Sequence, residues 1–295
     1  MVVIQKRLIR YMEEVSSVAG KLYIVGTPIG NLKDITLRAL EVLKSCDLVA
    51  AEDTRVTMRL LSHFEIKKPL ISYHKFNEEG RSENILDKVR EGQIVALVSD
   101  AGMPGISDPG AVIIEKAVEE GIDFEVIPGP TAVVTALVNS TLDTTKFAFR
   151  GFFPRENKDR EEIFKEIEGY RDTIIFYEAP HRIVSTLEFL KDRIPNRRMA
   201  LSREITKTYE ETIRGTVEEV YNKICDNGVR GEIVILIEGK SDDEIEKENR
   251  SKWEYMTIEE HIDYYIEKGN SKKEAIKLVA KERGISKREV YACSY

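Results

Sequence analysis

Cysteine and histidine are scarce in this chain. Its 295 residues include only three cysteines, Cys46, Cys225 and Cys293, which lie far apart and form no CxxC pair. Because there are also only four histidines, no zinc-binding spacing occurs. We therefore expect reduced thiols, a cytoplasmic chain and no bound metal.

Long apolar runs are lacking as well. No segment combines the length and hydrophobicity needed to span a bilayer, so we expect no association with a membrane. The basic side chains of Lys6, Arg7 and Arg10 interrupt the apolar residues near the N-terminus, which argues against a signal peptide. We interpret residues 1–20 as an N-terminal extension.

Several common functional signatures are absent. The chain has no GxxxxGK(S/T) loop, no GxGxxG after its first strand-like run and no GxSxG elbow. These absences argue against an ATPase-type phosphate loop, a dinucleotide site and a hydrolase of the elbow type. The net charge of −7 is unlike that of a general nucleic-acid-binding protein, so a contact with RNA would need a local basic surface.

What the chain does contain is an alternation of strand-like and helix-like segments. Apolar β-branched runs end in turn residues, and segments with helical spacing lie between them. The strand-like runs are residues 21–25, 47–51, 94–99, 124–127, 146–154, 172–182, 198–207 and 231–239, and the helical segments are residues 36–44, 111–119, 161–170 and 183–190. This pattern predicts an α/β fold with parallel or mixed sheets. The polar stretch 139–145 separates two predicted α/β domains, residues 21–140 and 145–240.

The C-terminal part has a different composition. Residues 241–256 are highly charged and are predicted to form a linker. Three capping boxes then predict three short helices over residues 257–295, with Gly284 at a helix end and a helix-turn-helix-like pair at the C-terminus. The boxes are Thr257 with Glu260, Ser271 with Glu274, and Ser286 with Glu289. Residues 272–288 contain seven Lys or Arg and two Glu, which fits a nucleic-acid contact and a solvated packing surface equally well.

Polar and glycine-rich loops follow the predicted strands, at the sheet edge where α/β proteins bind ligands. These loops carry Gly26, Pro28, Gly30, Asn31, Glu52, Asp53, Arg55, Asp100, Gly102, Gly105, Pro128, Gly129 and Pro130. In the longest of them, Gly102 and Gly105 leave room for a ligand to approach the backbone. Gly102→Val is therefore predicted to abolish ligand binding and to leave the fold intact.

Seven segments, taken together and in order, are similar to one known group of proteins. They are KLYIVGTPIGNLKDITLRALEVL, AEDTR, SYHKFNE, LVSDAGMPGISDPG, PGPTA, FYEAPHR and REITKTYEE, and the resemblance covers residues 21 to about 240. They resemble the ribosomal RNA small subunit methyltransferase I group of the tetrapyrrole methylase superfamily, the class III S-adenosylmethionine-dependent methyltransferases. The resemblance implies a homodimer whose two α/β domains, with mixed sheets, form a cleft for S-adenosylmethionine. It also implies methylation of the ribose 2′-hydroxyl of a cytidine in the decoding centre of 16S rRNA, within the small ribosomal subunit.

The resemblance also suggests roles for individual residues. The donor-binding set comprises Pro28, Asp100, Ala101, Gly102, Met103, Ile106, Ser107, Thr131, Ala132, Tyr177 and Glu178. The candidates for an RNA contact are Arg55, His74, Arg182, Arg203 and Lys207. The candidates for a catalytic base or hydrogen-bond partner, among which the sequence does not choose, are Asp53, His74, Glu78, Asp100, Glu178 and Lys207.

Two other functions remain open at this point. The first loop reads GTPIGN, without the aspartate of the GxGPGD pattern that is usual in tetrapyrrole methylases, and this argues for an RNA substrate over a corrin-like metabolite. The alternatives are a methylase of such a metabolite and a non-catalytic RNA-binding protein that senses S-adenosylmethionine. A purely structural α/β protein would not explain why polar loops gather at the strand ends of both halves.

Overall fold

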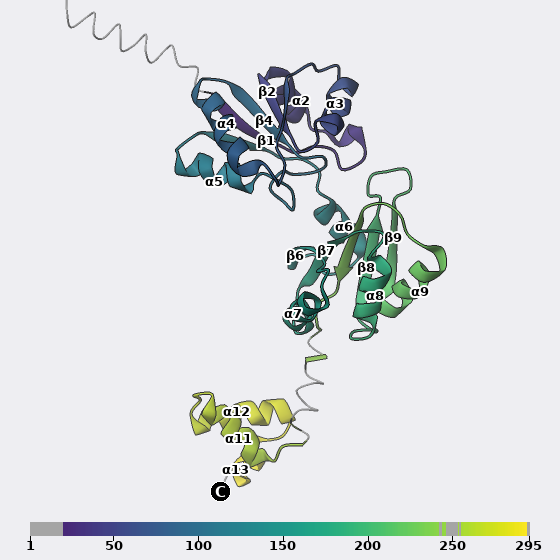
Figure 1. Cartoon of the computed structure of the whole chain (residues 1–295). Helices are drawn as coiled ribbons and strands as arrows, with labels where there is room; N and C mark the ends of the chain where they lie inside the picture. The colour runs from purple at the N-terminus through teal and green to yellow at the C-terminus, as the bar shows by residue number, and fades with distance from the viewer. Residues whose placement is uncertain (1–19, 242–243, 246–252, 254, 294–295) are drawn as a thin grey trace, which may run out of the picture. The chain divides into compact units, whose positions relative to one another are not determined.

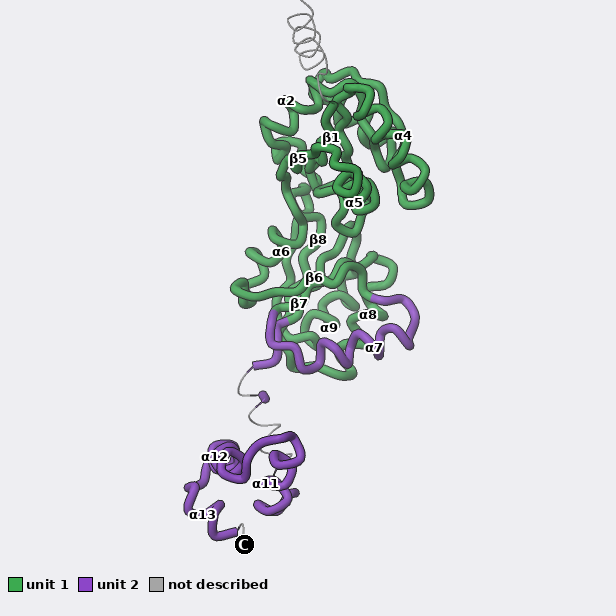
Figure 2. Tube along the Cα trace, turned by 90° about the vertical axis from the view of Figure 1, so that its left-hand side faces the viewer, with its two compact units in different colours: residues 1–153, 173–237 green, residues 154–172, 238–295 purple. Residues whose placement is uncertain are grey.

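The structure is a computed structural model that describes residues 20–241, 244–245, 253 and 255–293 (Figure 1). The predicted N-terminal extension lies outside the described residues except for Gly20, and so does most of the predicted linker. The chain divides into two compact units, residues 1–153 with 173–237 and residues 154–172 with 238–295 (Figure 2). In the part of the chain that is described, every helix is too short or too polar to cross a bilayer.

The first sheet has five parallel strands in the order β3-β2-β4-β1-β5. The strands are β1 (Lys21–Val25), β2 (Leu48–Ala51), β3 (Leu70–Ser72), β4 (Ile94–Val98) and β5 (Phe124–Ile127). The connecting helices are η1 (Leu32–Asp34), α2 (Leu37–Ser45), α3 (Thr54–His63), α4 (Glu78–Arg90) and α5 (Ala111–Glu119). Because a crossover helix joins each pair of consecutive strands, all the strands run in the same direction.

The centre of this sheet is buried on both faces. Leu97 of β4 packs in a cluster on one face, and Ala96 and Val98 of the same strand pack in a cluster on the other. The alternation of side chains along a strand produces this two-sided core, which explains the continuous apolar sequence of β4. Since β1 and β4 are neighbouring parallel strands, the loops that follow them lie side by side at the same sheet edge.

The second sheet has the order β6-β7-β10-β8-β9 and is mixed. Its strands are β6 (Phe147–Phe152), β7 (Thr173–Glu178), β8 (Arg198–Arg203), β9 (Glu211–Thr216) and β10 (Ile233–Ile237), and its helices are α8 (Ile183–Lys191) and α9 (Val217–Asn227). Strands β6 and β7 are parallel, whereas the other neighbours are antiparallel. The predicted α/β fold with two sheets is therefore confirmed, and the mixed arrangement belongs to the second sheet alone.

Helix α6 (Ala132–Ser140) follows β5 and packs against the second sheet. Its buried side chains Val133 and Leu137 share a core cluster with Ile175 of β7 and Leu236 of β10. Ile29, from the loop after β1, belongs to the same cluster. The first loop is therefore fixed against both halves of the first unit.

The second unit contains α7 (Asn157–Glu168), α11 (Ile258–Glu267), α12 (Lys272–Arg283) and α13 (Lys287–Ala292). The three predicted capping boxes are present at the starts of α11, α12 and α13. Gly284 ends α12 in the left-handed conformation, with φ of 64°. Ile262, Ile276 and Val290 form the centre of a small core that holds these three helices together.

Candidate active site

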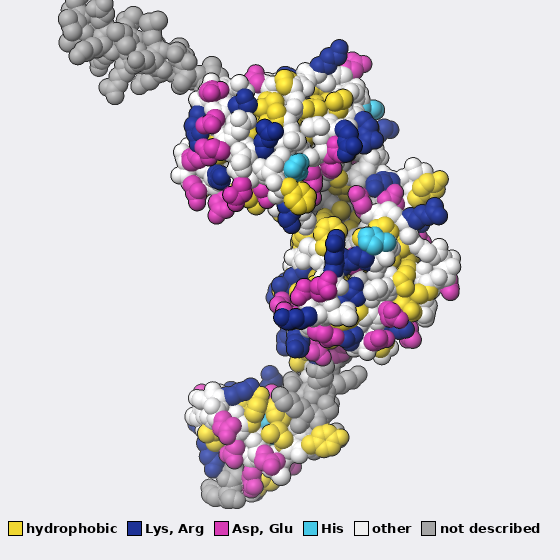
Figure 3. Space-filling model, in the orientation of Figure 1, with side chains coloured by type: hydrophobic (Ala, Val, Ile, Leu, Met, Phe, Trp, Pro, Cys, Tyr) yellow, Lys and Arg dark blue, Asp and Glu magenta, His cyan; other side chains and the backbone are white. Residues whose placement is uncertain are grey.

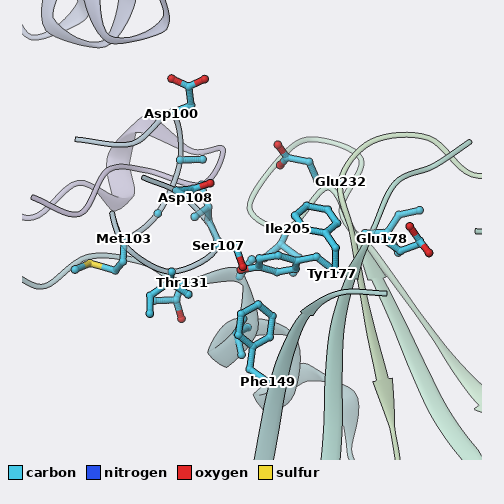
Figure 4. A pocket seen from close by; sticks show the side chains of 18 of the residues that line it. Asp100, Met103, Ser107, Asp108, Thr131, Phe149, Tyr177, Glu178, Ile205 and Glu232 are labelled. Carbon is cyan, nitrogen blue, oxygen red and sulfur yellow. The ribbon is translucent and has the colours of Figure 1, made fainter. Parts of the chain in front are cut away.

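A cavity of about 600 Å³ lies in the first unit, at the ends of β4, β6 and β7 and at the start of α6 (Figure 4). Ten of the eleven residues predicted to bind the donor line it. They are Asp100, Ala101, Gly102, Met103, Ile106, Ser107, Thr131, Ala132, Tyr177 and Glu178. A volume of this size is typical of sites for small-molecule ligands.

The loop after β4 has an unusual backbone that shapes one wall of the cavity. Gly102 has φ of 77° and pairs with Thr27 in two backbone hydrogen bonds, of 2.8 and 3.1 Å. Ser107 has φ of 66°, a conformation that non-glycine residues seldom adopt. A β-branched valine at position 102 would strain this backbone, so the expectation that Gly102→Val leaves the fold intact does not fit the structure.

Aromatic and aliphatic side chains form the opposite wall. Phe149 and Phe152 of β6 contact Tyr177 of β7 edge to face, with ring centroids 4.9 and 5.6 Å apart. Phe152 is 57% exposed and Ile106 is 53% exposed, although both are apolar. Figure 3 shows hydrophobic side chains exposed in the hollow between the surfaces of the two sheets. A ligand with a flat apolar part would cover this surface and gain the free energy of its burial.

Besides Glu178, four carboxylates line the same cavity: Glu52, Asp100, Asp108 and Glu232. Burial raises the pKa of Glu52 and of Asp100. Burial, together with the other three carboxylates, raises the pKa of Asp108 to about 7. Figure 4 shows Asp108 between Asp100 and Tyr177, and its carboxylate has no hydrogen bond or ion pair with any described residue. The cavity therefore favours a ligand that carries positive charge.

Several predicted site residues lie outside this cavity. Pro28 lines a second, neighbouring cavity. Asp53 caps α3 and is bound by Arg55, whose guanidinium hydrogen bonds lower the pKa of this carboxyl to about 2. His74, which precedes α4, and Glu78, the first residue of α4, line neither cavity. The structure therefore does not bring Asp53, His74 or Glu78 to the cavity as a catalytic base.

The side chains of Glu178 and Arg182 form an ion pair with each other and hydrogen bonds within the fold. The side chain of Glu178 is fully buried, accepts a hydrogen bond of 2.5 Å from Thr186 and lies 3.3 Å from the Arg182 guanidinium. Arg182 is only 13% exposed and also donates to the carbonyl of Phe153. These contacts argue against Glu178 as the base and against Arg182 as an RNA contact.

The remaining basic candidates are also paired. Arg203 donates to Glu211 at 2.8 Å, and Lys207 donates to Glu204 at 2.9 Å and to Glu232 at 3.1 Å. Lys207 nevertheless lines the second cavity, whereas Arg203 lines neither. Of these two cations, only Lys207 lines one of the two cavities.

The structure adds residues to the cavity that the sequence did not suggest as ligands. They are Ile29, Glu52, Asp108, Val133, Val134, Phe149, Phe152, Ala179, Pro180, Ile205, Glu232 and Ile233. Asp108 lies within the long glycine-rich loop, and Glu52 follows a predicted strand. Their positions in the sequence could therefore have suggested both of them as ligands. Phe149 and Glu232 had none, because only the folding of the second sheet brings them to the cavity.

This combination of a parallel sheet, a mixed sheet and a cavity at their strand ends defines the class of protein. Residues 21–221 match the family described as Tetrapyrrole (Corrin/Porphyrin) Methylases, and the chain belongs to this family. A crystal structure of uroporphyrin-III C-methyl transferase from Thermus thermophilus, complexed with S-adenyl homocysteine, has the same fold. The TM-score is 0.53 at 20% identity, over 74% of this chain and 97% of that one.

Within this family, the chain groups with the proteins named Ribosomal RNA small subunit methyltransferase I, as its motifs predict. The one from Halalkalibacterium halodurans is 46% identical over 272 residues, which cover 92% of this chain and 93% of the relative. The one from Thermotoga maritima is 45% identical over 221 residues, which cover 75% of this chain and 99% of the relative. About a quarter of this chain thus has no counterpart in the Thermotoga protein.

Proposed function

We propose that this chain is a methyltransferase that transfers a methyl group from S-adenosylmethionine to the RNA of the small ribosomal subunit. The names of the relatives, at 40–46% identity over most of the chain, support this substrate. The observation that carries the proposal is the cavity, which joins an aromatic wall to a group of carboxylates. The acceptor in this proposal is the ribose 2′-hydroxyl of a cytidine in the decoding centre of 16S rRNA.

The lining of the cavity suits the chemistry of the donor. When bound, S-adenosylmethionine supplies a methyl group on a positively charged sulfur. Asp108 and the other carboxylates favour a positive charge, and the rings of Phe149 and Tyr177 suit a flat adenine. The side chain of Thr131 caps the first turn of α6. The N-terminus of this helix favours a negative charge, such as that of the donor's carboxylate group. These features support the proposed donor-binding residues, now without Pro28 and with Asp108 and Phe149 added.

Asp100 is the catalytic candidate that the geometry favours most. It lines both the first and the second cavity, so it lies where a donor and an acceptor would meet. Its Oδ1 accepts a hydrogen bond of 2.9 Å from the backbone N–H of Asp53, which fixes its orientation. We assign to Asp100 the task of accepting a hydrogen bond from the acceptor hydroxyl and taking up its proton. The rest of catalysis is positioning of the two reactants.

The RNA contacts and the assembly also form part of this proposal. Arg55, Arg203 and Lys207 are proposed to contact phosphates, exchanging their present carboxylate partners for the RNA backbone. A homodimer, a cytoplasmic location and action on the small ribosomal subunit complete it. The proposed domains are residues 21–140, 145–240 and 257–295.

A corrin or porphyrin acceptor is the competing function that the family allows. In this chain Asn31 stands in the first loop where the GxGPGD pattern has its aspartate, which weighs against that acceptor. The test offers purified small subunits and a mixture of tetrapyrroles to the protein with labelled S-adenosylmethionine. Label in 16S rRNA supports the proposal, whereas label only in the tetrapyrrole fraction would overturn it. Donor binding without transfer to either acceptor would favour a sensor over an enzyme.

A further inference from the structure

A second cavity, of about 470 Å³, lies beside the first within the same unit. The first loop, α3 and the end of β4 form most of its wall, and Lys207 and Glu232 close it from the second sheet. Its volume is in the range of small-ligand sites. None of the residues that form the aromatic wall of the first cavity belongs to it.

The two cavities share a boundary. Ile29, Asp100, Ala101 and Glu232 line both of them. A group held in the second cavity would therefore lie beside the ligand of the first, at these four residues. For a transfer reaction this is the arrangement that two reactants require.

A loop with an unusual backbone closes the second cavity on the side of the second sheet. Glu204 and Thr206 both have positive φ, of 49° and 68°, in the loop that carries Lys207. The Thr206 hydroxyl accepts a hydrogen bond of 2.9 Å from the backbone N–H of Asn31. A Cβ at Gly30 would come within 2.6 Å of Lys207 Cγ, so the two loops touch closely. Strain of this kind is found where a backbone is shaped around a ligand.

The side chains in the second cavity combine apolar surface with one unpaired cation. Leu32, Val56 and Leu60 supply the apolar surface. Arg59 is exposed on α3, and it makes no hydrogen bond or ion pair with any described residue. Its charge is close enough to Asp100 to favour the ionised form of that carboxylate. Lys207, by contrast, is bound to two carboxylates.

We propose that the second cavity holds the target nucleotide of the acceptor RNA, with its phosphate on Arg59 and its ribose at the boundary beside Asp100. The base lies against Leu32 and Leu60. A nucleotide can enter such a cavity only when it is unstacked from its neighbours, as in a single-stranded loop or after base flipping. This inference rests on the proposed function, because it assumes an RNA acceptor.

Two variants test the proposal in the full-length protein. Arg59→Ala removes the phosphate contact, and it should raise the KM for small subunits about tenfold or more. It should also reduce the slope of log affinity against log salt by about one. Leu32→Trp, at an exposed position of the cavity wall, fills the space for the base and should reduce methylation as strongly.

Donor affinity separates these effects from a loss of folding. Calorimetric binding of S-adenosylhomocysteine should be unchanged in both variants, because neither residue lines the first cavity. The matched control is Arg81→Ala, an exposed arginine of α4 that lines neither cavity and should keep the wild-type KM.

The possible results distinguish the two proposals. If the wild-type protein methylates small subunits but Arg59→Ala and Leu32→Trp keep its KM, the second cavity is not the nucleotide site. Equal KM increases in Arg59→Ala and Arg81→Ala would also contradict it, since they would indicate a diffuse basic surface. If the wild-type protein transfers no methyl group to small-subunit RNA, the proposed function itself fails.

Discussion

Replacement of Asp108 by asparagine is expected to remove a pH dependence of donor binding. The pKa of Asp108 is about 7 because burial and three neighbouring carboxylates disfavour its ionised form. Those neighbours are Glu52, Asp100 and Glu232. Tyr177, which also faces Asp108, has its pKa raised to about 12, chiefly by burial, and stays neutral at physiological pH. Asp108 thus changes its charge around neutral pH.

The sign of the effect follows from the charge of the donor. A positive sulfonium binds the ionised form of Asp108 more tightly, so binding releases a proton and affinity rises with pH. If only the ionised form binds, a pKa of about 7 makes the dissociation constant fall about tenfold between about pH 6 and about pH 8. S-adenosylhomocysteine has a neutral sulfur, so its dissociation constant should depend much less on Asp108.

Isothermal titration calorimetry across this pH range measures both dissociation constants. Repeating the titrations in two buffers of different ionisation enthalpy measures the protons released. Asp108→Asn should bind S-adenosylmethionine with an affinity that hardly changes with pH. Asp123→Asn, an exposed aspartate outside both cavities, is the control and should behave as the wild type. A wild-type dissociation constant that is the same at both ends of the range would refute the reasoning.

Three further substitutions test other parts of the site. Tyr177→Ala should weaken donor binding about tenfold in calorimetry through the loss of buried ring surface, while Tyr177→Phe should bind as the wild type. Asp100→Asn keeps an oxygen for the Asp53 N–H but loses the base, so kcat should fall about 100-fold with little change in S-adenosylhomocysteine affinity. Arg182→Ala leaves Glu178 buried without its cation, so the free energy of unfolding should fall by about 3 kcal/mol in thermal or denaturant unfolding. The control Arg203→Ala breaks a more exposed ion pair and should lower the free energy of unfolding by less than about 1 kcal/mol. An unfolding free energy of Arg182→Ala equal to that of the wild type would restore Arg182 as a candidate RNA contact.

Local signals in the sequence were enough to predict most elements of the fold. The strands at residues 21–25 and 124–127 and the helix at 111–119 have the predicted bounds. The three C-terminal capping boxes form as expected, because each joins residues only three positions apart. Such short-range patterns do not depend on the rest of the fold.

Some of the elements that the sequence did not reveal have weak local patterns. Strand β3 is only three residues long, which is too short for an alternation to be recognised. Strand β9 lies at the edge of its sheet, and its sequence ETIRGT lacks a continuous apolar face. Helix α9, by contrast, begins with a capping box of Thr216 and Glu219 that could have been found.

The same difference separates the predictable and unpredictable parts of the site. The loop from Asp100 to Ser107 stands out in the sequence because its glycines follow a buried strand. The raised pKa of Asp108 does not, since it depends on carboxylates that are distant in the sequence. Likewise, the ion pair between Arg182 and the buried Glu178 depends on the folded strand and loop, so the sequence alone showed Arg182 only as a charged loop residue.

The most direct test of the account is to locate the transferred methyl group. Small ribosomal subunits from cells that lack this protein are incubated with the purified chain and labelled S-adenosylmethionine, and the RNA is digested to nucleosides. The account predicts label on the ribose 2′-hydroxyl of a single cytidine in the decoding centre of 16S rRNA, and much less label with Asp100→Asn. Label on a base, on a ribosomal protein or on no component of the subunit would contradict it.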